Sequence, residues 1–395
     1  MNRLGRKQQR QILNLMCQGN GIAAIADITG CSTNTVRAYL AHFGEALTAA
    51  HDRLVRGMSP TRIEIDELWS YVYAKRERSL ARENRKQPPP PDRGAFYTWV
   101  ALDPDSKLFI SWQVGDRSEK TGLPFLVDVN ARIAPGPVLI TTDGFKFYEQ
   151  AIPRVFGPDG KHVVIEKNIE SWRNPETGER GTRVISMKKV PKTRDKVNLS
   201  LASTSLVERL NGSIRNYISR FARQTYKFSK RLTNHVHAHA IFVMYYNFVK
   251  PHRGFKGPDR HLTPAMKAGL TNKVWTYDDL LDEVDEYWRR KALKPSLQVV
   301  PPCQHVPLER GETSPLPYFV MYSPKKRTAK VHKGSCGECK QGLGRKEGHS
   351  VQNKWFAFET ERAARRFAET LAPLENSVCS KCITGSYVKH RVRSR

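Results

Sequence analysis

The sequence has no long apolar run and is short of acidic residues. No apolar stretch approaches the length of a membrane-spanning helix, and the first residues lack the apolar core of a secretion signal. We therefore predict a cytoplasmic protein with no membrane partner. The chain has 38 Asp and Glu against 66 Lys and Arg, so its formal net charge is +28. This excess predicts an anionic partner, and nucleic acid is the commonest one.

Cysteine is also scarce, with 7 in 395 residues. Three are scattered, and the other four form two C-x-x-C pairs: Cys336, Cys339, Cys379 and Cys382. In a reducing compartment this pairing predicts a structural Zn²⁺ bound by four thiolates rather than disulfides. His332 or His349 could replace one cysteine. The gap between the pairs is longer than in a usual zinc ribbon, and a strand at 355–358 and a helix at 361–371 would fill it.

Residues 4–47 have the pattern of a three-helix unit with a helix-turn-helix. Gly30 suits the tight turn, and Ser32 is a good N-cap for the last helix. The N-terminal residues of such a helix enter the major groove of DNA. The candidates for contacts with bases or phosphates are Thr33, Asn34, Thr35 and Arg37. A plain helical domain that binds no DNA is the alternative.

A strand is predicted at 61–72, where Glu64 and Asp66 lie on one face and the isoleucines on the other. Asp143 directly follows a short apolar strand at 137–142, a position where functional sites collect in sheets that are covered on both faces. The other predicted elements are strands at 96–102, 107–114 and 162–166, helices at 119–130 and 145–152, and a polar insertion at 168–200. A proline-rich excursion at 76–94 interrupts the strands.

A helix at 203–219 places Glu208 and Arg215 on one face, two turns apart, opposite an apolar stripe. From Arg209 to Pro258 the chain has ten Lys or Arg and no acid. Such a tract typically neutralises phosphates, although a solvated basic face is the alternative. The residues predicted to contact DNA here are Arg209, Arg215, Arg220, Arg223, Lys227, Lys230 and Arg231.

Two further segments have less direct interpretations. His235, His237 and His239 could form a metal cluster, but residues two apart on a helix do not share a face, and a packed helix is favoured. The acidic amphipathic helix at 275–293 is expected to be solvated or to dock on the protein itself. A proline-rich linker is expected at 296–330.

The element order predicts an α/β fold: a ribonuclease-H-like core with an N-terminal all-α helix-turn-helix domain and a small C-terminal zinc-binding domain. The predicted boundaries are 1–50, 59–270, 271–330 and 331–395. In such a core, Asp66, Asp143 and Glu208 can converge at one edge of the sheet. Carboxylates suit Mg²⁺ or Mn²⁺, and two ions can activate the attacking oxygen and stabilise the leaving one. Asp143 would bridge the two ions.

Three segments resemble the motif blocks of bacterial insertion-sequence DDE transposases, and the insertion-sequence-one family most of all. They are 65–69 around Asp66, 142–145 around Asp143, and 204–215 around Glu208. The basic tract at 220–230 and the segments 246–253 and 262–266 are also similar. The resemblance covers about residues 1–275, and the proline-rich loop and the 168–200 insertion depart from it.

The resemblance implies metal-dependent attack of water, and then of a DNA 3′-hydroxyl, on phosphodiesters. By position, the resemblance also implies that Asp66, Asp143 and Glu208 are metal ligands and that Arg215 is the family's basic residue seven positions after the glutamate. It also implies double-stranded DNA as partner, a homodimer or higher multimer, and a nucleoid-associated location. Two alternatives remain open: a helix-turn-helix protein without catalysis, and a nuclease of the same fold that cleaves without joining.

Overall fold

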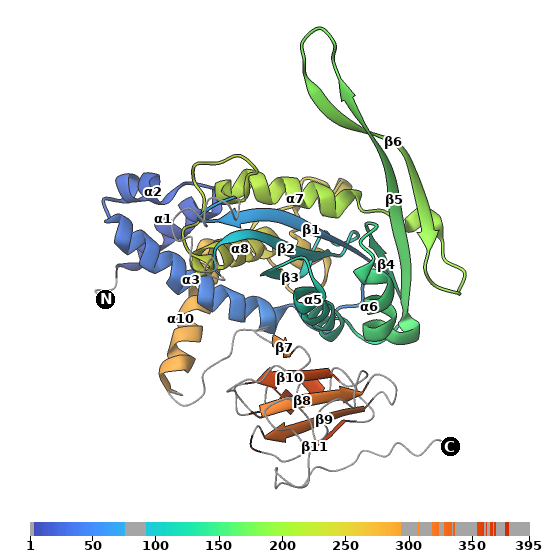
Figure 1. Ribbon diagram of the computed structural model, residues 1–395. Coiled ribbons are helices and arrows are strands. Elements are labelled where there is room, and N and C mark those ends of the chain that lie inside the picture. Colours follow the sequence, from blue (N-terminus) through green and yellow to red (C-terminus); the bar gives the residue numbers. More distant parts are fainter. Residues whose placement is uncertain are drawn as a thin grey trace, which may run out of the picture. The chain divides into compact units, whose positions relative to one another are not determined.

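The computed structural model describes residues 4–75, 92–293, 306–308, 318–323, 328–333, 335, 354–358, 376–378 and part of 361–368 (Figure 1). The chain divides into two units. The first holds residues 1–125 and 132–299, and the second holds 126–131 and 300–395.

Three helices form the N-terminal part of the first unit: α1 (Arg6–Cys17), α2 (Ile22–Thr29) and α3 (Thr33–Leu54). Gly30 ends α2 with a φ of 66°, a conformation that costs glycine little. The Ser32 side chain then accepts a hydrogen bond from Thr35 N at 3.0 Å and caps α3. The predicted helix-turn-helix, with this turn and this cap, is therefore confirmed as a structure.

Helix α3 extends to Leu54, beyond residue 47, where the predicted three-helix unit ends. Its second half buries Phe43, Leu47 and Ala50 and packs against α8 (Leu232–Met244). At Gly44 a Cβ would lie 2.2 Å from the Cβ of His237, so the two helices approach as closely as glycine allows. This one helix thus belongs both to the helix-turn-helix and to the interior of the unit.

A six-stranded sheet forms the centre of the unit, in the order β3-β2-β1-β4-β5-β6. The first five strands match the predicted ones. Strands β1 and β4, and β4 and β5, pair in parallel, whereas the other neighbours are antiparallel. The bounds are β1 (Arg62–Val72), β2 (Gly94–Leu102), β3 (Phe109–Gly115), β4 (Val138–Thr142), β5 (Gly160–Arg173) and β6 (Arg180–Pro191).

The prediction of an irregular insertion at 168–200 was wrong. Strand β5 continues to Arg173, turns at 174–179 and returns as β6, so that a long hairpin projects from the sheet (Figure 1). Asn174 closes this turn by accepting hydrogen bonds from the backbone N–H of Glu176 and Thr177. Both faces of the outer hairpin are exposed, so its sequence lacks the alternation by which a half-buried strand is recognised.

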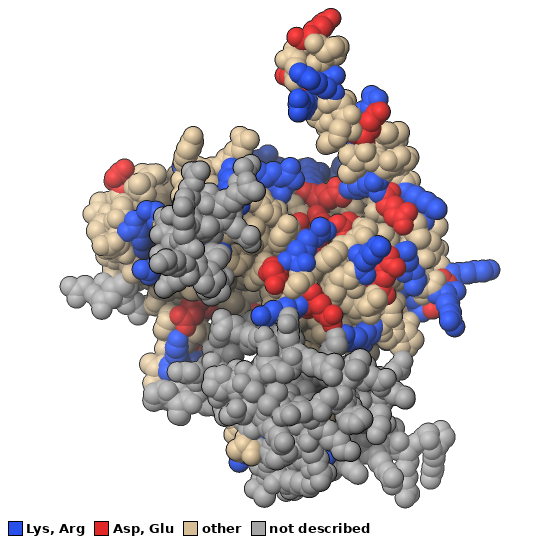
Figure 2. All heavy atoms as spheres, in the orientation of Figure 1, with Lys and Arg blue, Asp and Glu red and all other residues tan. Residues whose placement is uncertain are grey.

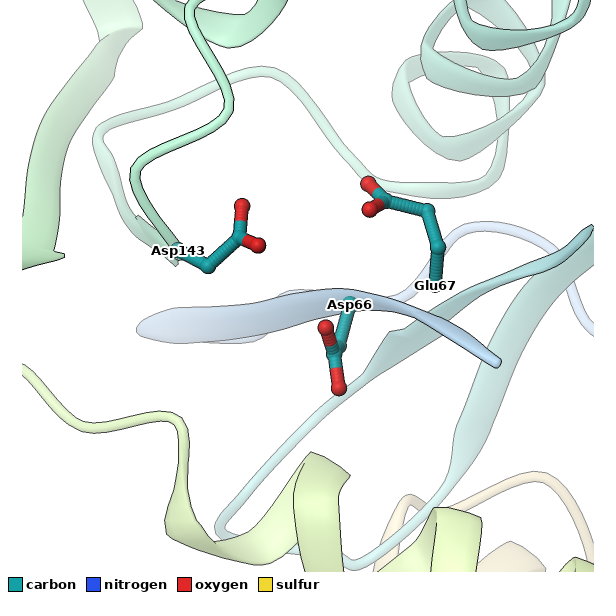
Figure 3. A group of neighbouring side chains, drawn as sticks. All are labelled: Asp66, Glu67 and Asp143. Carbon is teal, nitrogen blue, oxygen red and sulfur yellow. The ribbon is translucent and has the colours of Figure 1, made fainter. Parts of the chain in front are cut away.

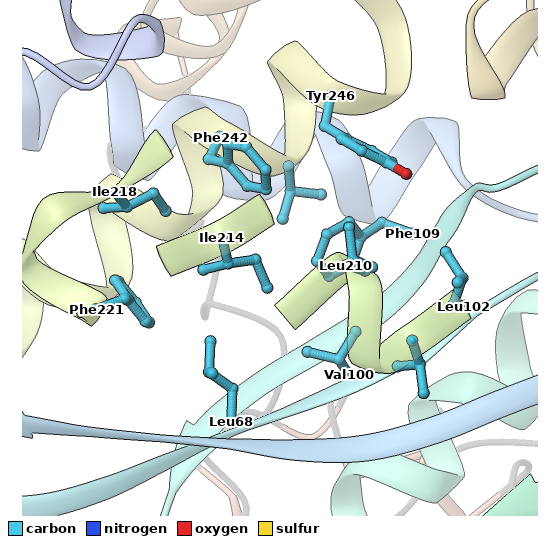
Figure 4. Packing of buried hydrophobic residues seen from close by; sticks show 12 residues of the cluster. Leu68, Val100, Leu102, Phe109, Leu210, Ile214, Ile218, Phe221, Phe242 and Tyr246 are labelled. Atoms are coloured by element: carbon cyan, nitrogen blue, oxygen red, sulfur yellow. The ribbon is translucent and has the colours of Figure 1, made fainter. Parts of the chain in front are cut away.

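Helices cover both faces of the sheet (Figure 1). On one face, Trp99 of β2 packs against Phe125 of α5 (Glu119–Arg132) and Tyr148 of α6 (Phe147–Phe156). On the other face, α7 (Ser205–Tyr217) and α8 pack on side chains of β1, β2 and β3. Figure 4 shows this cluster: Leu68, Val100, Leu102, Phe109, Leu210, Ile214, Ile218, Phe221, Phe242 and Tyr246. This packing fixes the distance between α7 and β1.

Helix α8 is a packed helix, as predicted, and its histidines are not a metal cluster. His235 and His239 are fully buried and stack or pack against Phe221. His235 Nε2 also lies 2.9 Å from the Ser70 hydroxyl. Burial lowers the pKa of His239 to about 3, so its ring is neutral inside the fold.

The acidic helix α10 (Tyr277–Leu293) docks on the N-terminal helices, the second of the two predicted possibilities. Arg6 of α1 contacts Asp282 and Asp285 and lies 3.2 Å from an oxygen of Asp278. The Trp288 ring stacks on His42 of α3 at 4.8 Å. A short helix, α9 (Pro264–Lys267), precedes it and is capped by Thr263. These contacts attach the helix-turn-helix to the rest of the unit from a second side.

The second unit contains a five-stranded sheet in the order β11-β9-β8-β10-β7. Two of its strands lie within 296–330, where we predicted a linker, because aromatic and β-branched residues at 318–323 fit a sheet despite the prolines around them. Strand β10 confirms the strand predicted at 355–358. The bounds are β7 (Val306–Leu308), β8 (Tyr318–Ser323), β9 (Thr328–Lys333), β10 (Lys354–Phe358) and β11 (Asn376–Val378).

Several predictions fall on residues that the structure does not describe. The four cysteines predicted to bind Zn²⁺, His349 and most of the proline-rich loop at 76–94 lie outside the described residues. His332 is described and is buried in β9. No helix among the described residues is both long enough and apolar enough to cross a bilayer.

The contact between α3 and α8 generates a stability prediction. Gly44→Val should lower the free energy of unfolding by about 2–4 kcal/mol, because the new side chain meets the backbone of His237. Urea denaturation followed by circular dichroism measures the change. Gly212→Ala in α7 is the control: nothing lies within 4 Å of its Cβ, and it should be neutral or stabilising by up to about 1 kcal/mol. Equal midpoints for Gly44→Val and the wild type would contradict this packing.

Candidate functional site

The register between β1 and β4 sets the first two acidic residues of the site side by side. The parallel pairs run from Arg62 with Leu139 to Glu64 with Thr141. Continuing this register by two residues on each strand brings Asp66 next to Asp143. Figure 3 shows Asp143 where the chain leaves β4, near the two acids of β1. Two residues far apart in the sequence thus meet at the carboxyl end of a parallel strand.

Three carboxylates gather at this point: Asp66, Glu67 and Asp143. Each offers an oxygen, and these oxygens all lie within 4.8 Å of one another. Asp66 and Glu67 are neighbours on a strand and point to opposite faces, so Glu67 reaches the group from the side of α5 and α6 (Figure 3). The sequence analysis did not include Glu67 in the site.

Glu67 and Asp143 are joined by Arg117, which the sequence analysis missed. The Arg117 Nε donates to Glu67 at 2.9 Å, and its Nη2 donates to Asp143 at 3.0 Å. The Glu67 side chain is 2% exposed and also accepts a hydrogen bond from the Tyr148 hydroxyl. Arg117 lies between β3 and α5, and no motif marks it. Its place in the site becomes visible once the sheet order is known.

The surroundings of Asp66 disfavour its charge. Burial, together with the nearby charges of Asp143 and Glu208, raises the pKa of Asp66 to about 6. Burial likewise raises the pKa of Glu67 to about 7, against the hydrogen bond from Tyr148. Negative charges are therefore crowded at a site where a cation would stabilise them.

Helix α7 brings Glu208 and Asn211 toward Asp66. Asn211 Nδ2 donates to Asp66 Oδ2 at 2.8 Å. The Glu208 charge contributes to the raised pKa of Asp66, so the two carboxylates are electrostatic neighbours. The carboxylate of Glu208 accepts hydrogen bonds from Thr204 Oγ1 at 2.6 Å and from Lys167 Nζ of β5. The structure thus brings Glu208 near the pair, but in ion-pair contact with Lys167 rather than within the group of three.

Glu64 positions α7. Its carboxylate accepts hydrogen bonds from the backbone N–H groups of Leu206 and Val207, both at 2.9 Å, in the first turn of the helix. These groups have no partner within a helix, and a carboxylate there is also favoured by the helix dipole. Glu64 is buried, so the bond ties α7 to β1 close to Asp66. The sequence analysis placed Glu64 on the same strand face as Asp66 but did not count it among the metal ligands.

The basic residues after Glu208 differ in their surroundings. Arg215 is half-buried on α7; burial and Arg223 lower its pKa, whereas the charge of Asp66 raises it. Arg220 points inward and donates to Ser229 Oγ and Asn234 O, which is a structural role. The other predicted DNA-contacting residues of the tract are exposed: Arg209, Arg223, Lys227, Lys230 and Arg231. Figure 2 shows Lys and Arg atoms around the acidic atoms at the base of the hairpin.

The candidates of the helix-turn-helix lie at the start of α3. Thr33, Asn34 and Arg37 are exposed and Thr35 is half-exposed. The Arg37 guanidinium donates to Asn34 Oδ1 at 2.7 Å and to Thr33 Oγ1 at 3.3 Å. Helix α10 packs elsewhere on α1 and α3, so the N-terminal end of α3 presents these groups to solvent.

Comparison with known proteins gives two similarities. Residues 6–54, the α1–α3 segment, match the family model described as bacterial regulatory proteins, luxR family. Among solved structures, the cryo-EM structure of a piggyBac transposase synaptic complex with hairpin DNA aligns over 79% of each chain, with 8% sequence identity and a TM-score of 0.28. No curated protein sequence matches the chain.

The raised pKa of Asp66 generates a pH prediction. The pKa of Asp66 is about 6 in the folded protein and about 4 in the unfolded chain. Its ionisation therefore lowers the free energy of unfolding as the pH rises from 4 to 6. Asp66→Asn should therefore stabilise the metal-free protein at pH 8 by about 1–3 kcal/mol and have little effect near pH 4. Urea denaturation in EDTA at both pH values measures this.

Asp159→Asn, a change at an exposed carboxylate of the same unit, serves as the control and should change neither value. Loss of stability in Asp66→Asn at pH 8 would contradict the crowding of negative charge around Asp66.

The link between Glu64 and α7 generates another stability prediction. Glu64→Ala leaves two buried N–H groups without their acceptor and should cost about 2–4 kcal/mol, whereas Glu64→Gln, which keeps an acceptor oxygen, should cost less. Urea denaturation of both variants gives the difference. If Glu64→Ala were as stable as the wild type, the carboxylate would not hold the helix.

Proposed function

We propose that this chain is a DNA transposase of the insertion-sequence-one type, with a ribonuclease-H-like core. In this proposal Asp66, Asp143 and Glu208 bind catalytic metal ions, and the chain cleaves the ends of a mobile DNA element and joins them to new DNA. The proposal combines the order of the motif blocks in the sequence with the sheet order β3-β2-β1-β4-β5 and the helices on both faces.

One observation carries most of the weight. The parallel register of β1 and β4 sets Asp66 beside Asp143, and α7 brings Glu208 into electrostatic contact with Asp66. A chance triple among 38 acids would not converge from two strands and a helix at one sheet edge. Convergence of separate segments is what metal-dependent phosphodiester chemistry requires.

The residues fit hard divalent cations such as Mg²⁺ or Mn²⁺. Asp66 and Asp143 offer oxygens within 4.8 Å, and the burial and like charges that raise the pKa of Asp66 would be relieved by a cation. When bound, two such ions would activate the attacking oxygen and stabilise the leaving oxygen of a phosphodiester. Glu208 could also bind a cation if a DNA phosphate replaced it as the ion-pair partner of Lys167.

The other residues of the site would orient the metal-binding carboxylates and contact the DNA phosphates. Arg117, which is held by Glu67, donates to Asp143 and fixes its orientation, and Asn211 fixes that of Asp66. Arg215, half-buried near Asp66, lies where a cation can contact a phosphate next to the cleaved bond. The exposed residues of the basic tract extend this positive surface along the DNA backbone.

DNA recognition is proposed for the N-terminal helices. The family-model match over 6–54 and the exposed residues at the start of α3 support it. Because two element ends must be brought together, we propose that the chain acts as a dimer or higher multimer in the cytoplasm, on the nucleoid. A Zn²⁺ bound by the C-terminal cysteines remains part of the proposal.

The test is nicking and joining of a supercoiled plasmid that carries the DNA flanking the gene, in Mg²⁺ or Mn²⁺. Wild-type protein should give joined products. Asp143→Asn should reduce them more than about a hundredfold, since even the partners of metal ligands cost about 10–100-fold. Asp159→Asn, at an exposed acid away from the site, should behave as wild type.

The products separate the rival functions. Nicks without joining would indicate a nuclease of the same fold and reject the transposase. DNA binding without metal-dependent products in the wild type would indicate a DNA-binding protein without catalysis. Equal products from wild type and Asp143→Asn would reject the assigned site.

A further inference from the structure

The β5–β6 hairpin has no role in the site as described so far. Beyond its base it is a two-stranded ribbon, and β6 forms an edge of the sheet. An isolated two-stranded ribbon is marginally stable in water. Its shaft shows mostly uncharged surface in Figure 2. A long ribbon with this composition indicates a surface that contacts a partner.

The strand register divides the outer hairpin into two faces. The pairs Lys167 with Met187, Ile169 with Val184, and Ser171 with Thr182 lie on one face, which we name the Lys167 face. It ends in the cross-strand pair Arg173 and Arg180. The opposite face carries the pairs Glu166 with Lys188, Asn168 with Ser186, Glu170 with Arg183, and Trp172 with Gly181. Ile185 is an extra residue in β6, a bulge, and it is the reason why Met187 and Val184 lie on the same face.

The two faces differ in chemistry. On the opposite face Glu170 and Arg183 form an ion pair at 2.7 Å, and Trp172, which is 41% exposed, packs on Gly181. On the Lys167 face the apolar side chains are open to solvent: Ile169 is 57%, Val184 50% and Met187 67% exposed. The paired residues that make up this face include no acid.

The charges at the two ends of the Lys167 face favour an anionic partner. At the base, Lys167 contacts Glu208, so the face begins at the proposed active site. At the outer end, Arg173 and Arg180 are directly opposite each other and exposed. Like charges directly across a strand pair are destabilising, and an anion bound between them would remove the cost.

Resting on the proposed function, we infer that the Lys167 face binds the duplex DNA that leads to the active site. Lys167 and the Arg173–Arg180 pair contact phosphates on either side, and the apolar side chains between them pack on the groove. The major groove, about 12 Å wide, admits a two-stranded ribbon. A second copy of the chain fits less well, because a two-fold contact of this face with itself would bring basic residues against basic residues.

The test compares two double variants with the same change of charge. Ile169→Glu with Val184→Glu places two acids on the Lys167 face, and Asn168→Glu with Ser186→Glu places two acids on the opposite face, one residue away on β5. All four positions are exposed, so neither variant disturbs a core. Thermal unfolding of both proteins checks that they fold equally well.

The readout is fluorescence anisotropy with a labelled duplex of about 40 bp that carries the flanking DNA, in EDTA and 0.1 M KCl. The Lys167-face variant should bind about tenfold or more weakly than wild type, and the opposite-face variant within about threefold. Bound duplex should also protect Arg173 and Arg180 of the wild type from trypsin.

Equal effects of the two variants, or no protection from trypsin, would overturn the inference. So would an unchanged DNA affinity accompanied by a lower mass of the Lys167-face variant in light scattering, which would assign the face to a second copy. If the wild type binds the duplex but gives no metal-dependent product, the proposed function fails while the binding result still decides this inference. A wild type that binds no duplex overturns both.

Discussion

The parallel pairing of β1 and β4 is the constraint on which the candidate site depends. The backbone pairing places Asp66 and Asp143 next to each other, so no contact between the two side chains is needed to hold them there. The stabilisation comes from elsewhere: apolar layers on both faces of the sheet fix the two strands, and Glu64 ties the first turn of α7 to β1. The cost of crowding carboxylates is thus met by packing and backbone hydrogen bonds that lie outside the site.

Most of the fold could be predicted where one face of an element is buried. Alternation marked β1, and the apolar run before Asp143 marked β4, because both strands face the core. Two errors have the opposite cause. The outer part of the β5–β6 hairpin is exposed on both faces, and β7 and β8 of the second unit lie among prolines, so neither segment showed a clear hydrophobic period. The predicted three-helix unit ended at residue 47, whereas α3 continues to Leu54, because its packing against α8 is not visible in the local sequence.

The candidate site was predicted in part. Asp66 and Asp143 follow from strand pattern, and Glu208 from the helix that carries an apolar stripe; their meeting depends on sheet order, which one sequence does not encode locally. Arg117, Tyr148 and Lys167 have no motif and join the site only through the fold. Some motif residues serve the fold instead: Asn247 bonds both backbone groups of Phe109, and Thr263 caps α9.

Helix α3 has a consequence for how the protein would measure DNA. Its 22 residues correspond to a rod about 33 Å long, close to one turn of the double helix. One end carries the residues proposed to contact bases, and the other is packed against α8 in the same continuous helix. Base pairs recognised at one end and a bond cut at the core would therefore keep one spacing and one rotational phase. Inserting half a turn of DNA between them would turn the bond away from the carboxylates, whereas a whole turn would restore its direction but not its distance.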